Sequence, residues 1–270
     1  MEIAELLQVP ALAATTWSID VRAVGGESLV SHLPDQRLRT ASVAKLFVLT
    51  ELARRIEDGS IDAAELVSKR SVEPVGDSGI WQHLDANTLT IDDAARLVGT
   101  HSDNLATNVL IARLGLEQIQ ATARTLASEH TQLLDIVRDV RTEEHPETLS
   151  EGTACDWANV MQRLANDPGP AAQRVLAWLA HSADLSMVAN TFDLDPLSHG
   201  SDPTADVRVW NKTGTDPGVR ADVGIVAGPR QQLAYAVLCN WEASASESRD
   251  TRRAVYAAMR AIGRHLESLT

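Results

Sequence analysis

Patterns typical of β-strands occur only near the two ends of this sequence, and this distribution constrains the fold more than any other feature. Five short segments carry them: residues 16–24, 27–33, 207–212, 221–227 and 233–240. Between these ends the apolar side chains recur mostly at helical spacing. A single sheet must therefore combine strands from both ends of the chain, with the central helices inserted between them.

We predict an α/β (α+β) fold, with one antiparallel sheet of N- and C-terminal strands flanked by the terminal helices and with an inserted all-helical lobe. The 270 residues are expected to form a single domain. Within it, residues 1–40 and 206–270 make up the sheet lobe, and residues 41–205 make up the helical lobe. A cleft between the two lobes is the default place for a ligand.

Several helix boundaries can be read from single residues. Residues 2–8 and Ser248–Leu266 have the apolar spacing of amphipathic helices at the two ends of the chain. Thr90 is expected to cap a central helix, with Asp93 as the acid three residues on. Gly59 is expected to end the helix that begins near Ser42.

The bulk composition limits the classes of function. A hydrophobic fraction of 44% and a charged fraction of 23% are those of a soluble globular protein. The net charge of -13 argues against nucleic acid and anionic membrane surfaces as partners, because both favour a basic patch. Cys155 and Cys239 are the only cysteines, and we expect buried thiols rather than a metal or redox site. We expect a monomer that acts on a small molecule, with no membrane span, cofactor or metal ion.

One pair of residues in the central region carries chemistry. Ser42 and Lys45 are three positions apart, so on one helix they would share a face. If that face is buried, the lysine loses solvation, part of its population becomes neutral, and the amine can take the proton of the serine hydroxyl. The positive end of the helix dipole would favour an oxyanion that develops nearby. The pair alone is a weak signal, because a helix with one exposed lysine also fits it.

Two further motifs strengthen this interpretation. Ser102–Asn104 has the sequence Ser-Asp-Asn, and Lys212–Gly214 has the sequence Lys-Thr-Gly. Lys45, Lys69 and Lys212 are the only lysines of the chain. Two of the three therefore fall inside these short motifs, which a set of solvated surface lysines does not explain.

With these motifs the chain resembles class A serine β-lactamases and the related penicillin-binding serine hydrolases. Ser42-Val43-Ala44-Lys45 and the two later motifs occur in the family's order and close to its spacing. The flanking residues 104–108 and 222–226 agree as well. The resemblance runs from about the first strand to the last helix, and it implies a β-lactamase/transpeptidase-like fold.

The resemblance also implies a role for each catalytic residue. Ser42 would attack the carbonyl carbon of the substrate and form an acyl-enzyme, and Lys45 would accept its proton, directly or through water. Ser102 would relay a proton to the leaving nitrogen. Lys212, held near Ser102, would supply positive potential for the carboxylate of the substrate. The backbone N–H groups of Ser42 and Thr215 would form the oxyanion hole.

The substrate-binding residues implied by the resemblance are Asn104, Thr213, Gly214, Thr215, Arg220 and Trp81. Asn104 would offer its side-chain amide to a carbonyl of the substrate, and the two threonines would hydrogen-bond the substrate carboxylate. Arg220 falls where some family members place a carboxylate-binding arginine, and an ordinary surface arginine fits there as well. Trp81 would form an aromatic wall at the mouth of the cleft, with a core position as the alternative.

The sequence departs from the family pattern in one loop. Class A β-lactamases carry a glutamate there, and it positions the water that deacylates the serine. Counting forward from Ser102 without gaps places Arg138 at the position of that glutamate, and no Glu-x-x-Leu-Asn occurs within residues 130–155. The nearby acids, as candidate replacements, are Asp135, Asp139, Glu143, Glu144 and Glu147. Exposed loop carboxylates are usually only solvated.

We therefore predict a serine hydrolase that works through an acyl-serine on β-lactams or related amides and esters. It should deacylate slowly, because no base is assured for the attacking water. A penicillin-binding peptidase on D-Ala-D-Ala peptides and an esterase remain open as alternatives. A non-catalytic ligand-binding module on the same fold is the alternative of a different class, and the complete set Ser42, Lys45, Ser102 and Lys212 argues against it.

The expected location depends on the start of the chain. Residues 1–7 carry acidic side chains where a secretory signal has a basic segment. We expect a cytoplasmic protein if the chain is complete, and a secreted or periplasmic one if a leader has been removed.

Overall fold

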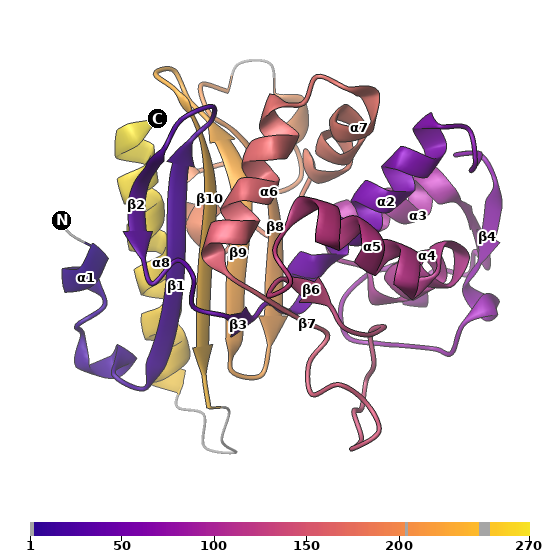
Figure 1. The fold of residues 1–270 in the computed structure, drawn as a ribbon, viewed down its shortest axis with the longest axis horizontal. Helices are drawn as coiled ribbons and strands as arrows, with labels where there is room; N and C mark the ends of the chain where they lie inside the picture. The colour runs from indigo at the N-terminus through magenta and orange to yellow at the C-terminus, as the bar shows by residue number, and fades with distance from the viewer. Residues whose placement is uncertain (1–2, 203–204, 243–248) are drawn as a thin grey trace.

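Strands from the two ends of the chain meet in one sheet. A computed structural model describes residues 3–202, 205–242 and 249–270. The five strands of the main sheet are all antiparallel and lie in the order β2-β1-β10-β9-β8 (Figure 1). They are β1 Thr15–Ala23, β2 Ser28–His32, β8 Arg208–Asp216, β9 Val219–Ala227 and β10 Gln232–Trp241. The predicted fold class is confirmed.

The pairing of β1 with β10 joins the two ends of the sequence. It runs from Thr15 opposite Trp241 to Ala23 opposite Leu233. The turn from β1 into β2 contains Gly25, whose φ of +81° is a left-handed conformation that glycine adopts without steric cost. At the other side of the sheet β8 is an edge strand, so its free edge faces the helices beside it (Figure 1).

Helices cover both faces of this sheet. Alternate side chains of a strand point to opposite faces. Val237 of β10 belongs to the core that α8 (Arg249–Leu269) completes, whereas its neighbour Ala236 belongs to the core that α6 (Ala154–Asn166) completes. Because α6 comes from the middle of the chain, the sheet is covered by a central helix as well as by a terminal one (Figure 1).

The other helices and strands have the following bounds. The helices beside the sheet, on the side of β8, are α2 Lys45–Glu57, α3 Ile91–His101, α4 Asn104–Leu114, α5 Leu116–Leu126 and α7 Pro170–Leu179, while α1 spans Ile3–Leu6 near the N-terminus (Figure 1). Two small sheets have the orders β3-β7-β6 and β4-β5. Their strands are β3 Leu38–Arg39, β4 Leu66–Ser68, β5 Thr88–Thr90, β6 Gln132–Leu133 and β7 Ser150–Gly152. Glu2 and Ser248, where two of the predicted helices start, lie outside the described residues.

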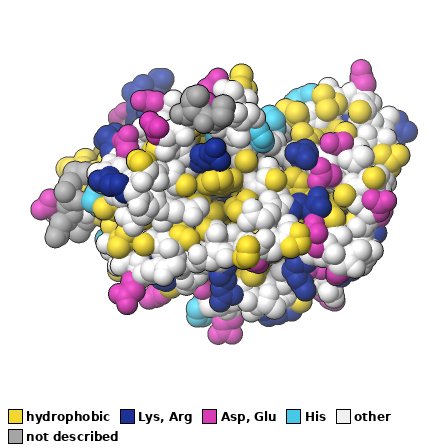
Figure 2. Space-filling view, turned by 90° about the horizontal axis from the view of Figure 1, so that it is seen from above, with side chains coloured by type: hydrophobic (Ala, Val, Ile, Leu, Met, Phe, Trp, Pro, Cys, Tyr) yellow, Lys and Arg dark blue, Asp and Glu magenta, His cyan; other side chains and the backbone are white. Residues whose placement is uncertain are grey.

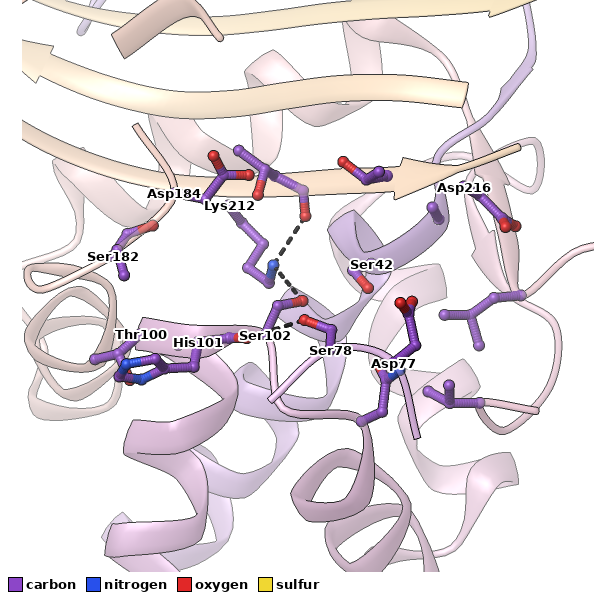
Figure 3. Close-up of a pocket in the computed structure, with 18 of the residues that line it drawn as sticks. Ser42, Asp77, Ser78, Thr100, His101, Ser102, Ser182, Asp184, Lys212 and Asp216 are labelled. Carbon is purple, nitrogen blue, oxygen red and sulfur yellow. Dashed lines mark hydrogen bonds between the residues drawn. The ribbon is translucent and has the colours of Figure 1, made fainter. Parts of the chain in front are cut away.

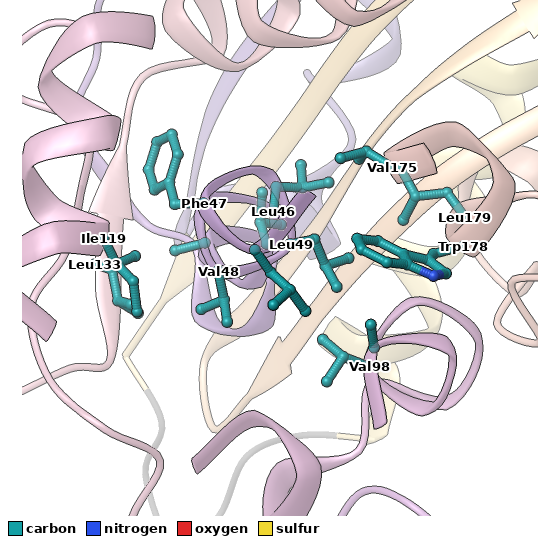
Figure 4. Packing of buried hydrophobic residues seen from close by; sticks show 14 of the residues in the cluster. Leu46, Phe47, Val48, Leu49, Val98, Ile119, Leu133, Val175, Trp178 and Leu179 are labelled. Carbon is teal, nitrogen blue, oxygen red and sulfur yellow. The ribbon is translucent and has the colours of Figure 1, made fainter. Parts of the chain in front are cut away.

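Helix α2 is buried along most of its length. The four side chains of Leu46–Leu49 have no exposed surface. The buried side chains around them are Val98, Ile119, Leu133, Val175, Trp178 and Leu179 (Figure 4). The ring of Phe47 also stacks on that of Trp157, with their centroids 4.8 Å apart. A helix segment that is apolar on all sides, as residues 46–49 of α2 are, belongs in a core, and this packing fixes the position of the first residue of the helix, Lys45.

The surface carries charges of both signs. Figure 2 shows one face of the molecule, on which acidic and basic side chains are interspersed. Acidic residues predominate over the whole chain, which has a net charge of -13. None of the helices within the described ranges is both long and apolar enough to cross a membrane.

The N-cap of α3 provides a test of local stability. Thr90 Oγ1 accepts the N–H of Asp93 at 3.0 Å, as the sequence predicts. The Thr90→Ala variant loses this bond, and we expect its free energy of unfolding to fall by about 1 kcal/mol. Thr90→Ser, which keeps the hydroxyl, should stay within about 0.5 kcal/mol of the wild-type value. Urea denaturation of the three proteins measures the difference, and an equal loss in both variants would contradict the assignment of this cap.

Candidate active site

Ser42 lies on a tight turn at the start of the buried helix α2. The turn is a 3-10 helix, Ala41–Ala44, and Lys45 is the first residue of α2. The sequence predicted both residues on one helix, and the structure differs by placing Ser42 on the tighter turn that leads into it. Ala41 has a φ of +48°, a left-handed conformation that is strained for a residue with a side chain and that is common at functional sites.

Ser150 on β7 holds this turn in place. Its Oγ donates to the carbonyl oxygen of Ala41 at 2.6 Å and lies 2.8 Å from Thr40 Oγ1. Its own carbonyl oxygen accepts the N–H of Thr40 at 3.1 Å. The strained residue 41 is therefore fixed from outside the turn, and the half-buried Ser42 follows it directly.

Lys45 connects the helix α2 with the Ser-Asp-Asn motif. Its Nζ donates to the carbonyl oxygen of Ser102 at 2.6 Å and to Oδ1 of Asn104 at 2.7 Å, and it lies 3.3 Å from Ser102 Oγ. The side chain has no exposed surface. The pairing of the first two motifs, which the sequence suggested from their residue types, is thus a direct contact.

Burial lowers the pKa of Lys45 well below its ordinary value, and the positive charge of Lys212 lowers it further. Asp103 and Asp77 oppose this shift with their negative charges. A neutral amine has two N–H groups and one lone pair. The two short hydrogen bonds of Lys45 can use both N–H groups, which leaves the lone pair to accept a proton.

Ser102 Oγ lies between the two lysines. Lys212 Nζ donates to it at 2.9 Å and to the carbonyl oxygen of Thr213 at 2.8 Å. Ser102 itself is the C-cap of α3, with a left-handed φ of +53°. This conformation turns the chain sharply between α3 and α4 and lets both the carbonyl and the hydroxyl of Ser102 contact Lys45.

Lys212 is a buried cation without an adjacent counter-ion. Only 2% of its surface is exposed, and no carboxylate in the described part of the chain lies within ion-pair distance of it. Burial lowers its pKa to about 8, against the opposing charges of Asp184 and Asp222. A buried cation in this state attracts an incoming anion, because the anion would offset part of its desolvation.

Asp103 and Asn104 brace the loop that crosses the site. Asp103 caps α4 by accepting the N–H of Ala106 at 2.8 Å, and its second oxygen accepts the N–H groups of Ile80 and Trp81, both at 2.8 Å. Asn104 Nδ2 donates to the carbonyl oxygen of Gly76 at 2.9 Å. The Ser-Asp-Asn motif therefore has a structural part as well as a chemical one, since it anchors residues 76–81.

Gly214 is required by a close approach between β8 and the Ser42 turn. A Cβ atom on Gly214 would lie 2.1 Å from the carbonyl oxygen of Thr40 and 3.2 Å from Val43 Cγ2. No side chain fits this space without moving the backbone. The glycine of the Lys-Thr-Gly motif thereby lets the edge of β8 lie directly against the turn that carries Ser42.

These elements enclose a cavity of about 810 Å³ between β8 and the ends of the helices (Figure 3). The predicted site residues that line it are Ser42, Ser102, Asn104, Lys212, Thr213 and Thr215. Lining residues to which the sequence assigned no role include Asp77, Ser78, Thr100, His101, Ser182, Ala183, Asp184 and Asp216. They lie at loops and element ends, where tertiary packing rather than local pattern decides what faces the cavity.

Two of the predicted substrate-binding residues lie elsewhere. Trp81 has no exposed surface, belongs to the main core and donates from Nε1 to the carbonyl oxygen of Ala86 at 2.9 Å. Arg220 on β9 donates from Nε to Tyr256 Oη at 3.1 Å and from Nη1 to the carbonyl oxygen of Asp216 at 3.1 Å. The structure therefore places Trp81 in the core position, and the guanidinium of Arg220 hydrogen-bonds the backbone of Asp216 on the cavity wall.

The loop that departs from the family pattern is held by a buried carboxylate. Arg138 and Arg141 both contact Asp135, at 2.7 Å and 2.8 Å. Burial would raise the pKa of Asp135, but hydrogen bonds from Arg138, the N–H of Ile136 and Arg141 outweigh it and hold that pKa below its ordinary value. Glu143, Glu144 and Glu147 are exposed and do not line the cavity. The loop thus presents Val137, Arg138, Asp139 and Arg141 to the site.

A second buried network beneath β8 was not foreseen. Asp222 has no exposed surface and accepts hydrogen bonds from Asn211 Nδ2 at 3.2 Å, Tyr235 Oη at 3.0 Å and the N–H of Val188 at 2.9 Å. Burial raises its pKa to about 7. Asn211 also donates to the carbonyl oxygen of Asp184 at 3.1 Å, so the network ties the cavity wall to β8. The sequence contains one signal for this network, namely a charged residue, Asp222, inside the apolar run 221–227.

Comparisons with known proteins point to one family. The sequence matches the family described as "Beta-lactamase enzyme family" over residues 2–266. Among solved structures, a β-lactamase from Sphaerobacter thermophilus has a TM-score of 0.80 at 24% identity, over 98% of this chain and 97% of that one. A class A β-lactamase from Mycobacterium abscessus has a TM-score of 0.76 at 20% identity, over 98% of both chains. A PBP-A mutant, in an acyl-enzyme complex with penicillin G, has a TM-score of 0.76 at 17% identity, over 98% and 96%. No curated protein matches the sequence.

The close approach at Gly214 gives a test that separates the site from the fold. In Gly214→Ala the added methyl group must push β8 away from Thr40, so we expect at least a tenfold slower covalent labelling of Ser42 by a reactive acyl donor and a stability loss of about 1–3 kcal/mol. The rate of labelling is followed by intact-mass spectrometry.

Gly59→Ala is the matched control. Gly59 has a φ of +78° and open space around its Cα, and it follows the C-terminal end of α2, the end of that helix remote from Ser42. An alanine there strains the backbone, so it should reduce stability without changing the labelling rate. If Gly214→Ala were labelled at the same rate as wild type, the close approach of β8 to Thr40 would not be required for the reaction of Ser42.

Proposed function

The chain belongs to the β-lactamase enzyme family, whose members are serine hydrolases, and we propose that it acylates Ser42 with β-lactams or related amides and esters and then deacylates slowly. The observation that carries this proposal is the position of Ser102 Oγ, 2.9 Å from Lys212 Nζ and 3.3 Å from Lys45 Nζ, in the cavity that Ser42 lines. Two buried lysines with lowered pKa values on either side of one hydroxyl form a path for proton transfer.

Acylation begins with attack of Ser42 Oγ on the carbonyl carbon of the substrate. Lys45 accepts the hydroxyl proton, because burial favours its neutral form. The negative charge that develops on the carbonyl oxygen is stabilised by the backbone N–H groups of Ser42 and Thr215, at the close contact that Gly214 permits. This arrangement stabilises the transition state more than the bound substrate, which is the requirement for catalysis.

The leaving group departs on the side of Ser102. The proton held by Lys45 passes through Ser102 Oγ to the leaving nitrogen, and Lys212 supplies the positive potential that keeps the relay in place. A carboxylate on the leaving part of the substrate binds beside Lys212 and the hydroxyls of Thr213 and Thr215, all of which line the cavity. Asn104 uses Oδ1 for Lys45 and one N–H of Nδ2 for Gly76, and its second N–H is left for the acyl part.

Deacylation needs a water molecule and a base to activate it. Where class A β-lactamases carry a glutamate, this loop has Arg138 next to Val137, and the carboxylate of Asp135 is occupied by two arginines. The acyl-enzyme is therefore expected to accumulate. In a binding module the full set of Ser42, Lys45, Ser102 and Lys212 would have no function.

Intact-mass spectrometry after incubation with benzylpenicillin tests this proposal. We expect an adduct of one penicillin on Ser42 that persists over many minutes, because the groups for acylation are in place whereas Arg138 stands where class A β-lactamases have the glutamate that positions the deacylating water. Ser42→Ala should give no adduct and, in a pure binding module, would leave the affinity for penicillin unchanged. Rapid consumption of the drug without a lasting adduct would contradict slow deacylation, and no adduct at all would contradict the acyl-serine itself.

The charge of Lys212 predicts an alkaline limit for anionic substrates. Lys212 is charged below its pKa of about 8 and loses its charge above it, so binding of a carboxylate is strongest below pH 8 and is lost as the pH rises through that value. The penicillin concentration for half-maximal acylation rate should therefore rise up to about tenfold per pH unit above the pKa. The methyl ester of the same penicillin, which has no carboxylate, is the control and should show no such rise. Equal pH profiles for acid and ester would contradict a role of Lys212 in anion binding.

A further inference from the structure

We propose that Asp77 is the general base that activates water for the slow deacylation of Ser42. This inference rests on the acyl-serine function proposed above and assigns the step that the loop glutamate performs in class A β-lactamases. Asp77 lines the cavity, and Figure 3 shows its carboxylate pointing into it on the same side as Ser42. No hydrogen bond or ion pair holds this carboxylate within the described residues, so it is available to a water molecule.

The other carboxylates around the cavity have partners or positions that disfavour this role. Asp135 is held by Arg138 and Arg141, and Asp139 accepts the N–H of Gly76 at 2.9 Å. Asp184 lines the cavity beside Lys212 and accepts two hydrogen bonds from Ser186. Asp216, on the exposed end of β8, is the remaining candidate and is therefore included in the test.

The backbone at Asp77 is strained and is held in that state. Its φ of +64° is left-handed, a conformation that is uncommon for a residue with a side chain and that collects at functional sites. Gln82 Nε2 donates to the carbonyl oxygen of Asp77 at 3.1 Å. On either side, the carbonyl oxygens of Gly76 and Ser78 accept hydrogen bonds from Nδ2 and the backbone N–H of Asn104, at 2.9 Å and 3.0 Å. The motif residue Asn104 thus holds the strained residue over the site.

Asp77 is also electrostatically coupled to the catalytic residues. Its negative charge acts on Lys45, where it opposes the lowering of the lysine pKa. A carboxylate in this position also stabilises the cationic form of Lys45 after that amine has taken the proton of Ser42. The same charge acts on Asp216 across the cavity.

The chemical step balances with the groups present. Asp77 takes one proton from a water molecule while the water oxygen forms a bond to the acyl carbonyl carbon, and the oxyanion is held by the N–H groups of Ser42 and Thr215. The tetrahedral intermediate then collapses, the bond from the carbonyl carbon to Ser42 Oγ breaks, and the proton passes through Lys45 or water to Oγ. The product leaves as a carboxylic acid, and Asp77 and Ser42 return to their initial states.

The test compares the lifetime of the penicillin adduct in Asp77→Asn and in wild type. Asparagine has nearly the same shape and adopts left-handed conformations readily, so the loop should keep its structure. General bases accelerate a reaction on the order of 10²–10⁴-fold. Because the deacylation is already slow, we expect a smaller effect, in which the adduct of Asp77→Asn lives at least about tenfold longer than that of wild type. The adduct should still form, because acylation uses Lys45 and Ser102, and its rate of formation is measured alongside so that the lost Asp77 charge near Lys45 is seen separately from the lifetime.

Two controls separate a chemical role from a structural one. Hydroxylamine is a stronger nucleophile that needs no base, so it should cleave the adduct equally fast in both proteins, whereas a distorted site would slow this reaction as well. Glu147→Gln removes an exposed acid outside the cavity and should leave the lifetime unchanged.

The outcomes distinguish the two proposals. A wild-type lifetime in Asp77→Asn, or a longer lifetime in Asp216→Asn but not in Asp77→Asn, would overturn the role of Asp77 while leaving the acyl-serine intact. No adduct on the wild-type protein would overturn the acyl-serine and, with it, the role of Asp77.

Discussion

The burial of two lysines without adjacent carboxylates is the constraint on which the site depends. Lys45 and Lys212 are almost fully buried, and no ion pair to either occurs within the described residues. Burying an unpaired charge costs several kcal/mol, which the neutral form of the lysine or an incoming anion can relieve. Carbonyl dipoles, such as those of Ser102 and Thr213, offset part of this cost. The remaining cost of burying the two lysines is offset by the packing around them, above all by the apolar side chains of α2 that hold Lys45 in place.

Much of this arrangement could be predicted from the sequence because its signals are local or lie in short motifs. The Thr90 cap and the turn at Gly25 each depend on a few neighbouring residues, and both are present in the structure. The alternating pattern located β1, but its residues from Trp17 to Val21 are all buried, because helices cover both faces of the sheet. The three motifs indicated which residues from distant parts of the chain belong together. The contacts between Lys45, Ser102 and Lys212 agree with that grouping.

The remaining features depend on long-range packing, which short patterns do not encode. Nothing local distinguishes Trp81 at the mouth of a cleft from Trp81 in the core, and the structure places it in the core because the loop 76–81 folds inward onto Asp103. Asp77 carries no motif, and its position follows from hydrogen bonds to Asn104 on either side of it. Asp222 could be noticed only as a charge within an apolar strand, and its partners come from three separate segments.

The pairing of β1 with β10 has a consequence for the order in which the chain can fold as it is synthesised. Residues 15–23 leave the ribosome early, but their partners at 233–241 follow only after more than two hundred further residues have been made. Until then β1 can pair only with β2, and such an isolated hairpin is marginal in water. The helices of the middle segment, with their local contacts, can form first, whereas the sheet closes in a late, non-local step. A nascent chain halted before β8 would therefore hold Ser42 and Ser102 but lack Lys212 and the strand edge that completes their cavity, so the candidate site is assembled only after β8 has been made.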